Sequence, residues 1–450
     1  MAEIAIITRV STSPLDIAAA DWNALLALQA QPTPFMRHEY LTALHESGSA
    51  TPHTGWTPRF LSLWQGDVLW AACPLYVKSH SYGEYVFDWA WANAYAEHGL
   101  PYYPKAVVAV PFTPVPGTRL MARDGEARAA LVQALRDWCT QAGVSSLHLL
   151  FADDTDMDAC KAAGLMQRQT VQFHWKNVAP TLGTAVSSLP PKGALAALGR
   201  PGGGSMTPTL GTGVSSLPPE GALAALGRPG GGSMAYRDFD DFLSSLSQEK
   251  RKKIRQERRR VADAGVRFEW RRGTDITPAD WDFFYRCYER TYLEHGNPPY
   301  LTRDFFQRMA AHMPEAWLLF VAERNGQPIA SSLIAISAYQ SSARGQKHSD
   351  FVAYGRYWGA LERVDCLHFE ACYYQPLQWC IAHGVQRFEG GAQGEHKMAR
   401  ALLPVPTHSA HWLAHPAFAD AVGHYLEREG IGMTHYLEHL QARNPLRSQQ

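Results

Sequence analysis

The sequence predicts a mixed α/β fold in which one arrangement of strands and helices occurs twice. Both ends of the 450-residue chain alternate short strand patterns with amphipathic helix patterns. The residues Trp-Cys, followed at the same distance by Gly-Val, stand at 138–144 and again at 379–385. Each copy lies where a helix pattern gives way to a strand pattern. We therefore expect two domains of related structure.

In the N-terminal part, residues 58–77 form two apolar runs, RFLSLW and VLWAACPLYV, around a Gln-Gly-Asp turn, which predicts two strands. Residues 126–141 place large apolar side chains on one helical face, and Gly143 is a helix stop. The run SSLHLLF at 145–151 predicts a strand directly after this helix.

The C-terminal part repeats this order. Residues 316–337 predict a hairpin that turns at an Asn-Gly pair. Residues 351–359 predict another strand, and residues 368–382 predict a helix that Gly384 ends. The run VQRFEGG at 385–391 predicts the strand that follows.

A tandem repeat separates the two parts. Residues 181–206 and 209–234 are nearly identical copies with a period of 28 residues. Pro-Pro and Gly-Gly-Gly steps leave too little apolar surface to form a core, so we expect disorder and a surface insertion. The expected domains are 1–178, the insertion 179–235, the C-terminal domain 236–415 with the active site, and a helical tail 416–450.

The bulk composition excludes several classes of protein. Lys+Arg and Asp+Glu both number 42, so no overall basic field indicates DNA as a partner. The 7 cysteines are scattered without a Cys-x-x-Cys pair, which predicts neither disulfides nor a metal site. No long apolar run or signal-type N-terminus is present, so we expect a cytoplasmic protein without a membrane partner.

The segment from Tyr354 to Lys397 mixes ionisable groups with Tyr and Trp. Such a mixture at strand ends is typical of a pocket that orients a polar substrate, and equally of a core strand with a polar rim. The candidate residues in it are Tyr354, Arg356, His368, Glu370, Gln393, Glu395, His396 and Lys397.

Glu370, on the predicted helix, is either a general base or an acceptor for an Arg or Tyr side chain, and His368 is either a catalyst or a residue of the helix cap. In FEGGAQGEHK, a continued strand would place Glu395 and Lys397 on one side and His396 on the other. Lys397 would then hold a carboxylate or phosphate and Glu395 an amine. The alternative is a surface ion pair.

Residues 247–265 predict a strongly basic helix, with Arg251, Arg255 and Arg258 on one face. This face is either a site for phosphate groups or a solvated helix surface. Residues 91–120 are rich in proline and tyrosine and include His98, Tyr102 and Tyr103. They either line a cleft or pack at a domain interface.

Several motifs together resemble one known family. In chain order they are YAEHGLPYYPK, QFHWKN, YRDFDDFLSSLSQEKRKKIRQERRRV, YGRYWG, LHFEACYYQ and FEGGAQGEHK. They are similar to the FemAB-like, GNAT-related family of peptidoglycan biosynthesis/recognition, over the whole chain except 180–234. The resemblance implies two tandem GNAT-type domains as in Fem ligases, with a cleft between them. It also implies acyl or aminoacyl transfer to an amine; the Fem ligases move an aminoacyl group from tRNA to a cell-wall precursor.

The donor is left open between acyl-CoA and aminoacyl-tRNA. Acetyl-CoA enzymes of the GNAT fold cradle pyrophosphate on an [Q/R]-x-x-G-x-[G/A] loop that opens a helix. Residues 356–361 fail this pattern at the last position, and residues 387–392 match it in a predicted strand. This favours an aminoacyl-tRNA or another activated acyl donor over acyl-CoA. The expected acceptor is a small molecule or peptide, and tRNA is a candidate partner. The alternatives are an acetyl-CoA-dependent N-acetyltransferase and a non-catalytic protein that binds a cell-wall fragment or nucleotide.

The acceptor amine must lose a proton, and a carboxylate is expected to accept it. Glu395 is the first choice for this general base and Glu370 is the second. Lys397 and Arg356 are expected to hold an anionic part of the substrate. Backbone N–H groups of residues 351–359 are expected to stabilise charge on the carbonyl oxygen.

Overall fold

The structure is a computed structural model that describes residues 5–178, 235–343, 346–392 and 394–446. We call residues 5–178 the N-terminal half and residues 235–446 the C-terminal half. The predicted tandem repeat lies outside the described residues.

The N-terminal half contains nine strands and five α-helices within its described residues. The strands are β1 (Ile6–Ser11), β2 (Trp56–Pro58), β3 (Phe60–Gln65), β4 (Val68–Cys73), β5 (Leu75–Lys78), β6 (Lys105–Val108), β7 (Met121–Ala122), β8 (Ser146–Ala152) and β9 (Met166–Lys176). The helices are α1 (Ala19–Ala27), α2 (His38–Glu46), α3 (Trp89–Glu97), α4 (Gly125–Ala142) and α5 (Asp154–Ala162).

The C-terminal half begins with two helices and ends with the longest one. Its strands are β10 (Val266–Arg272), β11 (Trp317–Arg324), β12 (Gln327–Ala343), β13 (Gln346–Ala360), β14 (Arg387–Ala392) and β15 (Leu403–Leu413). Its helices are α7 (Phe239–Ser245), α8 (Gln248–Asp263), α9 (Pro278–Glu294), α10 (Arg303–His312), α11 (Leu367–Phe369), the π-helix η6 (Glu370–Tyr374), α12 (Gln375–Ala382), the 3₁₀-helix η7 (Glu395–Arg400) and α13 (Pro416–Ala442).

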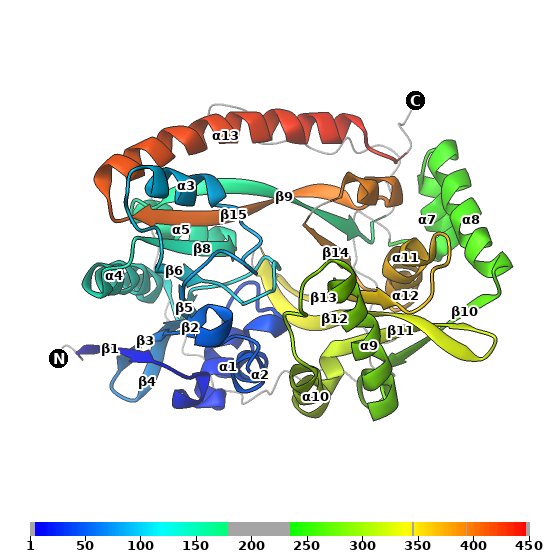
Figure 1. Ribbon diagram of the computed structural model, residues 1–450, viewed down its shortest axis with the longest axis horizontal. Coiled ribbons are helices and arrows are strands. Elements are labelled where there is room, and N and C mark those ends of the chain that lie inside the picture. The colour runs from blue at the N-terminus through cyan, green and yellow to red at the C-terminus, as the bar shows by residue number, and fades with distance from the viewer. Residues whose placement is uncertain (1–4, 179–234, 344–345, 393, 447–450) are drawn as a thin grey trace.

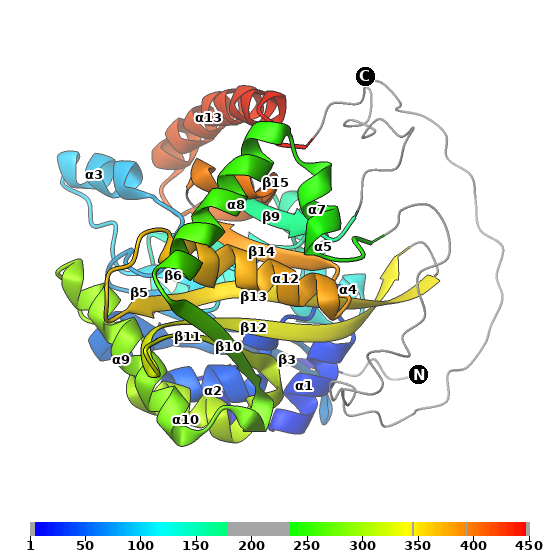
Figure 2. The ribbon, with the colours of Figure 1, turned by 90° about the vertical axis from the view of Figure 1, so that its right-hand side faces the viewer.

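One large sheet runs through both halves in the order β10-β11-β12-β13-β14-β9-β15-β8-β6-β5-β2 (Figure 1). A second sheet of β1, β3, β4 and β7 belongs to the N-terminal half. Helices lie on both sides of the large sheet, and α13 runs along β9 and β15 (Figures 1 and 2). The predicted mixed α/β fold is confirmed.

The sequence echo marks a strand–helix–strand unit that occurs twice. β6 and β8 are parallel neighbours joined through α4, and β13 and β14 are parallel neighbours joined through α12. Both helices end at a left-handed glycine, with φ of 65° at Gly143 and 68° at Gly384. The next amide then donates to the cysteine carbonyl, from Val144 in one unit and Val385 in the other.

The two halves exchange their following strands. β9 leaves the N-terminal unit and pairs antiparallel with β14 of the C-terminal unit, while β15 pairs antiparallel with β8. β9 and β15 also pair with each other from Leu403↔His174 to His411↔Met166. The centre of the large sheet therefore consists of strands drawn alternately from the two halves.

Aromatic packing also joins the halves. The rings of Phe35 and Tyr354 meet edge to face with centroids 5.3 Å apart, and Tyr40 meets Phe305 at the same distance. All four side chains belong to one buried cluster. The core of the molecule is thus built jointly by both halves.

The described chain stops and resumes at almost the same point. The backbone N–H of Asn177 donates to Gln386 O at 2.8 Å, and the N–H of Tyr236 donates to Asn177 Oδ1 at 3.0 Å. Tyr236, near the start of the C-terminal half, therefore lies beside Asn177, near the end of the N-terminal half.

Candidate active site

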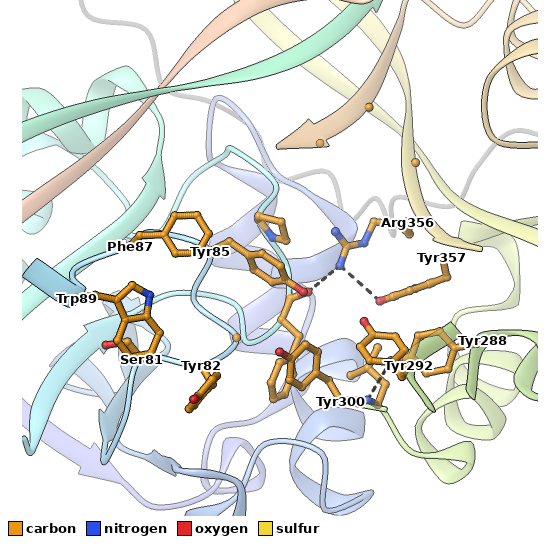
Figure 3. A pocket seen from close by; sticks show the side chains of 17 residues that line it. Ser81, Tyr82, Tyr85, Phe87, Trp89, Tyr288, Tyr292, Tyr300, Arg356 and Tyr357 are labelled. Atoms are coloured by element: carbon orange, nitrogen blue, oxygen red, sulfur yellow. Dashed lines mark hydrogen bonds between the residues drawn. The ribbon is translucent and has the colours of Figure 1, made fainter. Parts of the chain in front are cut away.

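A cavity of about 480 Å³ opens between the two halves (Figure 3). We call it the central cavity. The N-terminal half contributes Ser81, Tyr82, Gly83, Tyr85, Phe87, Trp89, Phe112 and Pro114, and the C-terminal half contributes Tyr288, Tyr292, Tyr300, Leu301, Gly355, Arg356, Tyr357, Gly390 and Gly391. Its volume suits a small molecule or one end of a larger one.

The central cavity begins where two parallel strands separate. β13 and β14 pair from Val352↔Arg387 to Tyr354↔Glu389, and their pairing ends there. On the other side of β13, the register with β12 passes from Tyr357 to Gly355, so Arg356 is a bulge residue without a partner in either strand. A bulge next to a strand separation frees backbone groups and directs them toward a ligand.

Two glycines allow this separation to remain open to the cavity. A Cβ added at Gly390 would lie 2.3 Å from Leu402 Cδ2 and 2.9 Å from Phe173 O. A Cβ at Gly355 would lie 3.0 Å from the Phe388 ring. Close packing disfavours a side chain at both positions, more strongly at Gly390 than at Gly355, so the backbone itself lines the cavity.

Arg356 supplies the positive charge of the central cavity. Its Nη2 donates to Phe112 O at 2.9 Å, and its guanidinium lies over the rings of Phe35 and Tyr357 at 5.2 and 5.1 Å (Figure 3). Its Nε is buried without a hydrogen-bond partner among the described residues. No carboxylate pairs with this guanidinium there, so the site is suited to an anionic group of a ligand.

The walls of the cavity are aromatic. Tyr300 stacks on Phe112 with centroids 4.9 Å apart and meets Tyr292 at 5.3 Å, while Tyr288 meets Tyr357 at 5.5 Å. Burial raises the pKa of Tyr288, Tyr292 and Tyr300, so these phenols stay protonated at neutral pH. Such walls bind a flat or apolar ligand group.

Lys397 lies directly behind the cavity. Its Nζ donates to Gly390 O at 2.7 Å and to Gly391 O at 3.3 Å, and the residue is 7% exposed. Burial lowers the pKa of the Lys397 ammonium to about 8. The amine thus supports the backbone that lines the cavity, and it is not itself a lining residue.

The predicted strand through Glu395 is wrong. Gly394 has a φ of 94°, which ends the extended backbone, and residues 395–400 form η7. Glu395 is exposed on this turn and accepts hydrogen bonds from Arg443 at 2.6 Å and Tyr436 at 3.0 Å. These bonds lower the pKa of Glu395. The carboxylate does not line the cavity, and a lowered pKa does not favour a general base.

Residues 370–374 of the predicted helix form the π-helix η6, which has more residues per turn than the expected α-helix. Gln375 Nε2 donates to Glu370 Oε1 at 2.7 Å. Glu370 also pairs with Arg258 at 3.0 Å and is 3% exposed. Of the two roles foreseen for Glu370, the geometry favours the structural acceptor.

The remaining candidates of this segment lie at the edge of the site or beyond it. Tyr354 is 1% exposed and packs in the joint core. His368 contacts the rings of Trp358 and Tyr373, and His396 Nε2 lies 3.3 Å from Tyr373 Oη. Gln393 lies outside the described residues.

The basic helix α8 is distant from the central cavity's lining. Arg258 pairs with Glu370, and Arg255 lies 3.6 Å from Asp240. Arg251 is half-buried near the start of the helix. Anion binding by this face of α8 stays a prediction.

The proline-rich stretch 91–120 contributes to the cavity through residues that were not singled out. Phe112 and Pro114 line it, whereas His98 is exposed and packs against Phe418. Tyr102 is buried, with its hydroxyl donating to Asp88 Oδ2 at 2.6 Å, and Tyr103 Oη lies 2.8 Å from Ser81 Oγ. Both tyrosines thus stand behind the cavity wall.

The lining residues 81–89 and 288–301 escaped sequence reasoning. They belong to segments about 200 residues apart, and each is an ordinary run of aromatic residues on its own. The exposure of Tyr82, Phe87 and Trp89, at 59%, 55% and 41%, marks the cavity mouth only once the fold is known.

Two properties hold for the described ranges. None of the helices there is long and apolar enough to cross a membrane. No group of three or more His, Cys, Asp or Glu side chains is placed there so that it would hold a metal ion.

Known structures resemble the chain over most of its length at low identity. FemX matches with 9% identity over 90% of this chain and 98% of its own, at a TM-score of 0.47. L-PGS from Bacillus licheniformis matches with 11% identity over 93% and 99%, at 0.47. A tandem GNAT protein from the clavulanic acid biosynthesis pathway matches with 12% identity over 92% and 99%, at 0.39. No curated protein sequence matches significantly.

The FemAB-like family, described as peptidoglycan biosynthesis/recognition, matches residues 13–180 and 232–448. The two matched ranges flank the tandem repeat and include both strand–helix–strand units. The protein therefore belongs to the FemAB-like family, and its described residues have the mixed α/β fold that the sequence predicted.

Proposed function

We propose that the protein transfers an acyl or aminoacyl group to an amine of a small molecule or peptide bound in the central cavity. The family description supports a cell-wall precursor or peptide as the acceptor. Aminoacyl-tRNA is the preferred donor and acyl-CoA the alternative, because the segments 356–361 and 387–392 lie in strands and do not open a helix.

The observation that carries this proposal is the open junction between β13 and β14. Acyl transfer builds negative charge on the carbonyl oxygen, and backbone N–H groups fixed in a cavity stabilise that charge. The bulge at Arg356 supplies a backbone position without a strand partner at this junction. The guanidinium of the same residue attracts an anionic part of donor or acceptor.

A non-catalytic binding protein is the second candidate. Among the described residues, no carboxylate, histidine or cysteine lines the central cavity. A cavity with aromatic walls and one arginine is sufficient to bind an anionic ligand without reaction. The two candidates differ in whether a group outside the lining accepts a proton.

Radiolabelled aminoacyl-tRNA and acetyl-CoA, each incubated with the full chain and a nucleotide-linked cell-wall peptide or a lysine-containing peptide, test the proposal. Label in the peptide, dependent on the protein, is the expected result. Binding of the peptide without transfer from either donor would favour the binding protein.

The Arg356→Gln variant tests the cavity as the site. Losing one charge-assisted interaction of about 1.5–3 kcal/mol corresponds to a 10- to 100-fold weaker apparent affinity for the anionic reactant. Arg303→Gln, which removes an exposed arginine paired with Asp282, is the control and should leave the affinity unchanged. Equal affinity in Arg356→Gln and wild type would move the site elsewhere.

A further inference from the structure

A buried ionic cluster lies behind the wall of the central cavity. Lys105 Nζ donates to Glu84 Oε2 at 2.8 Å and also contacts Asp88 Oδ2. Lys78, at the end of β5, donates to Tyr82 O at 3.1 Å and lies over the Trp56 ring at 3.6 Å. These four ionisable residues are between 0% and 4% exposed.

Two carboxylate oxygens of the cluster have no hydrogen-bond donor among the described residues and can accept a proton. Glu84 Oε1 and Asp88 Oδ1 are both buried without a hydrogen-bond partner among the described residues. A buried carboxylate oxygen without a donor is costly, and protonation relieves that cost. Two unpartnered carboxylate oxygens beside two lysines therefore form a site where an additional proton is accommodated.

Glu84 is the member best suited to bind this proton. Burial raises the pKa of Glu84 to about 7, against the opposing effect of Lys105 and with a further rise from Asp88. Asp88 differs: burial raises its pKa, but Lys105, His148 and Tyr102 lower it more, to about 2. Burial also lowers the pKa of Lys78 to about 7. The charge of the cluster thus changes near neutral pH.

Ser81 connects the cluster to the central cavity. Ser81 lines the cavity (Figure 3). Its Oγ accepts a hydrogen bond from Lys105 Nζ at 2.7 Å. On the far side, the cluster continues through Tyr102 to His148, at 3.2 Å. Burial lowers the pKa of His148 to about 3, so that imidazole stays neutral and does not store the proton.

We propose that the Lys78–Glu84–Asp88–Lys105 cluster, reached through Ser81, takes up the proton that the acceptor amine releases on acylation. The inference rests on the proposed function and supplies the proton acceptor that the cavity lining lacks. Ser81 contacts the reactant, whereas Glu84 and Lys105 act through it.

The protons balance as follows. An acceptor ammonium carries three protons on nitrogen. As the C–N bond forms and the donor's C–O or C–S bond breaks, one proton stays on the amide and one goes to the leaving oxygen or sulfur. Because Lys105 is an ammonium that donates to Ser81 Oγ, it first passes one of its protons to Glu84. The hydroxyl proton of Ser81 then passes to the neutral Lys105 amine, and the third proton of the acceptor passes to Ser81 Oγ. Glu84 ends neutral, while Ser81 and Lys105 regain their initial states.

The first experiment requires no substrate. The full chain is labelled with ¹³C at glutamate carboxyl carbons, and the resonance missing from Glu84→Gln identifies Glu84. We expect that resonance to titrate near pH 7. A Glu84 carboxylate that stays ionised down to its ordinary acid range would show a fixed ion pair and overturn the proposal.

The second experiment is the pH–rate profile of transfer. Wild-type kcat/KM should rise as the pH passes about 7, because Glu84 must be ionised to accept a proton. Glu84→Gln should remove this rise, and both it and Ser81→Ala should lower the rate on the order of 100-fold at neutral pH. Ser81→Ala leaves the charged cluster intact, so it remains informative if Glu84→Gln does not fold.

Asp156→Asn is the matched control. Burial likewise raises the pKa of Asp156 to about 7, but this carboxylate accepts from the backbone N–H groups of Arg119 and Leu120 and does not line the cavity. Its profile should follow wild type. Normal wild-type transfer with unchanged profiles in Glu84→Gln and Ser81→Ala overturns the relay alone. No transfer to any amine by wild type overturns the proposed function and the relay together.

Discussion

Replacing Gly359 with alanine should force α9 away from β13. Gly359 faces the helix backbone, and a Cβ added there would lie 1.8 Å from Cys287 O and 2.2 Å from Cys287 C. The next helix residue, Tyr288, lines the central cavity, and its backbone N would be 2.9 Å away. A single methyl group therefore disturbs both a core contact and the cavity wall.

The magnitude follows from what must move. Ordinary contacts of a Cβ begin near 3.4 Å, so the helix has to shift by more than an ångström. Overpacked cores lose about 1–3 kcal/mol of unfolding free energy, mainly where side chains reorient. Here backbone meets backbone, and Thr291 Oγ1 donates to Trp358 O at 3.0 Å across the same contact. We therefore expect Gly359→Ala to lose unfolding free energy at the upper end of this range, about 3 kcal/mol.

Urea unfolding of Gly359→Ala and Gly430→Ala measures the effect. Gly430 lies inside α13 with nothing within 4 Å of its added Cβ, so alanine there should stabilise the protein by about 0.5–1 kcal/mol. A loss below about 1 kcal/mol in Gly359→Ala would refute the close approach of α9 to β13. Equal shifts in both variants would show a general effect of alanine.

Further predictions concern charge, the insertion and η6. Burial lowers the pKa of Lys78 from 10.5 to about 7, so folding releases a proton from this lysine between these two pH values. The free energy of unfolding of the wild type should therefore rise with pH over that window. Urea unfolding at pH 7 and 9 should show no such rise in Lys78→Met. The same rise in the variant as in the wild type would contradict this prediction. Replacing residues 180–234 with a short linker should leave the unfolding curve unchanged, since Asn177 contacts Tyr236; insoluble protein would contradict it. Glu370→Gln should lower the free energy of unfolding by about 1 kcal/mol, and by less at high salt, because it breaks the ion pair with Arg258. A variant that keeps its full stability but loses turnover would indicate a catalytic role for Glu370.

Local elements could be predicted from the sequence because local signals define them. Helix α4 follows the apolar spacing before Gly143, and the hairpin of β11 and β12 follows its Asn-Gly turn. The duplicated unit was visible because both helix ends need a left-handed glycine followed by a buried residue. Each of these signals lies within one element and its cap.

The candidate site was harder to predict because it depends on contacts between distant segments. Arg356 was identified, since a lone arginine among aromatic residues is a local signal. Ser81 and Tyr288 gave none, because only the fold brings them together. Glu395 was misplaced because nothing in the sequence shows where the extended backbone stops. The strand β14 ends at Ala392, and Gly394, with a φ of 94°, directly precedes η7.

The exchange of β9 and β15 has a consequence for how the protein tolerates a break in its chain. Every strand pairing of the large sheet survives a cut between residues 178 and 235. The pairings that join the halves run between β9 and β14, between β9 and β15, and between β15 and β8. Two fragments expressed separately, 1–178 and 235–450, would each carry the strand that completes the other. Complementation of this kind would make the assembly of the central cavity depend on fragment association, because both halves line it.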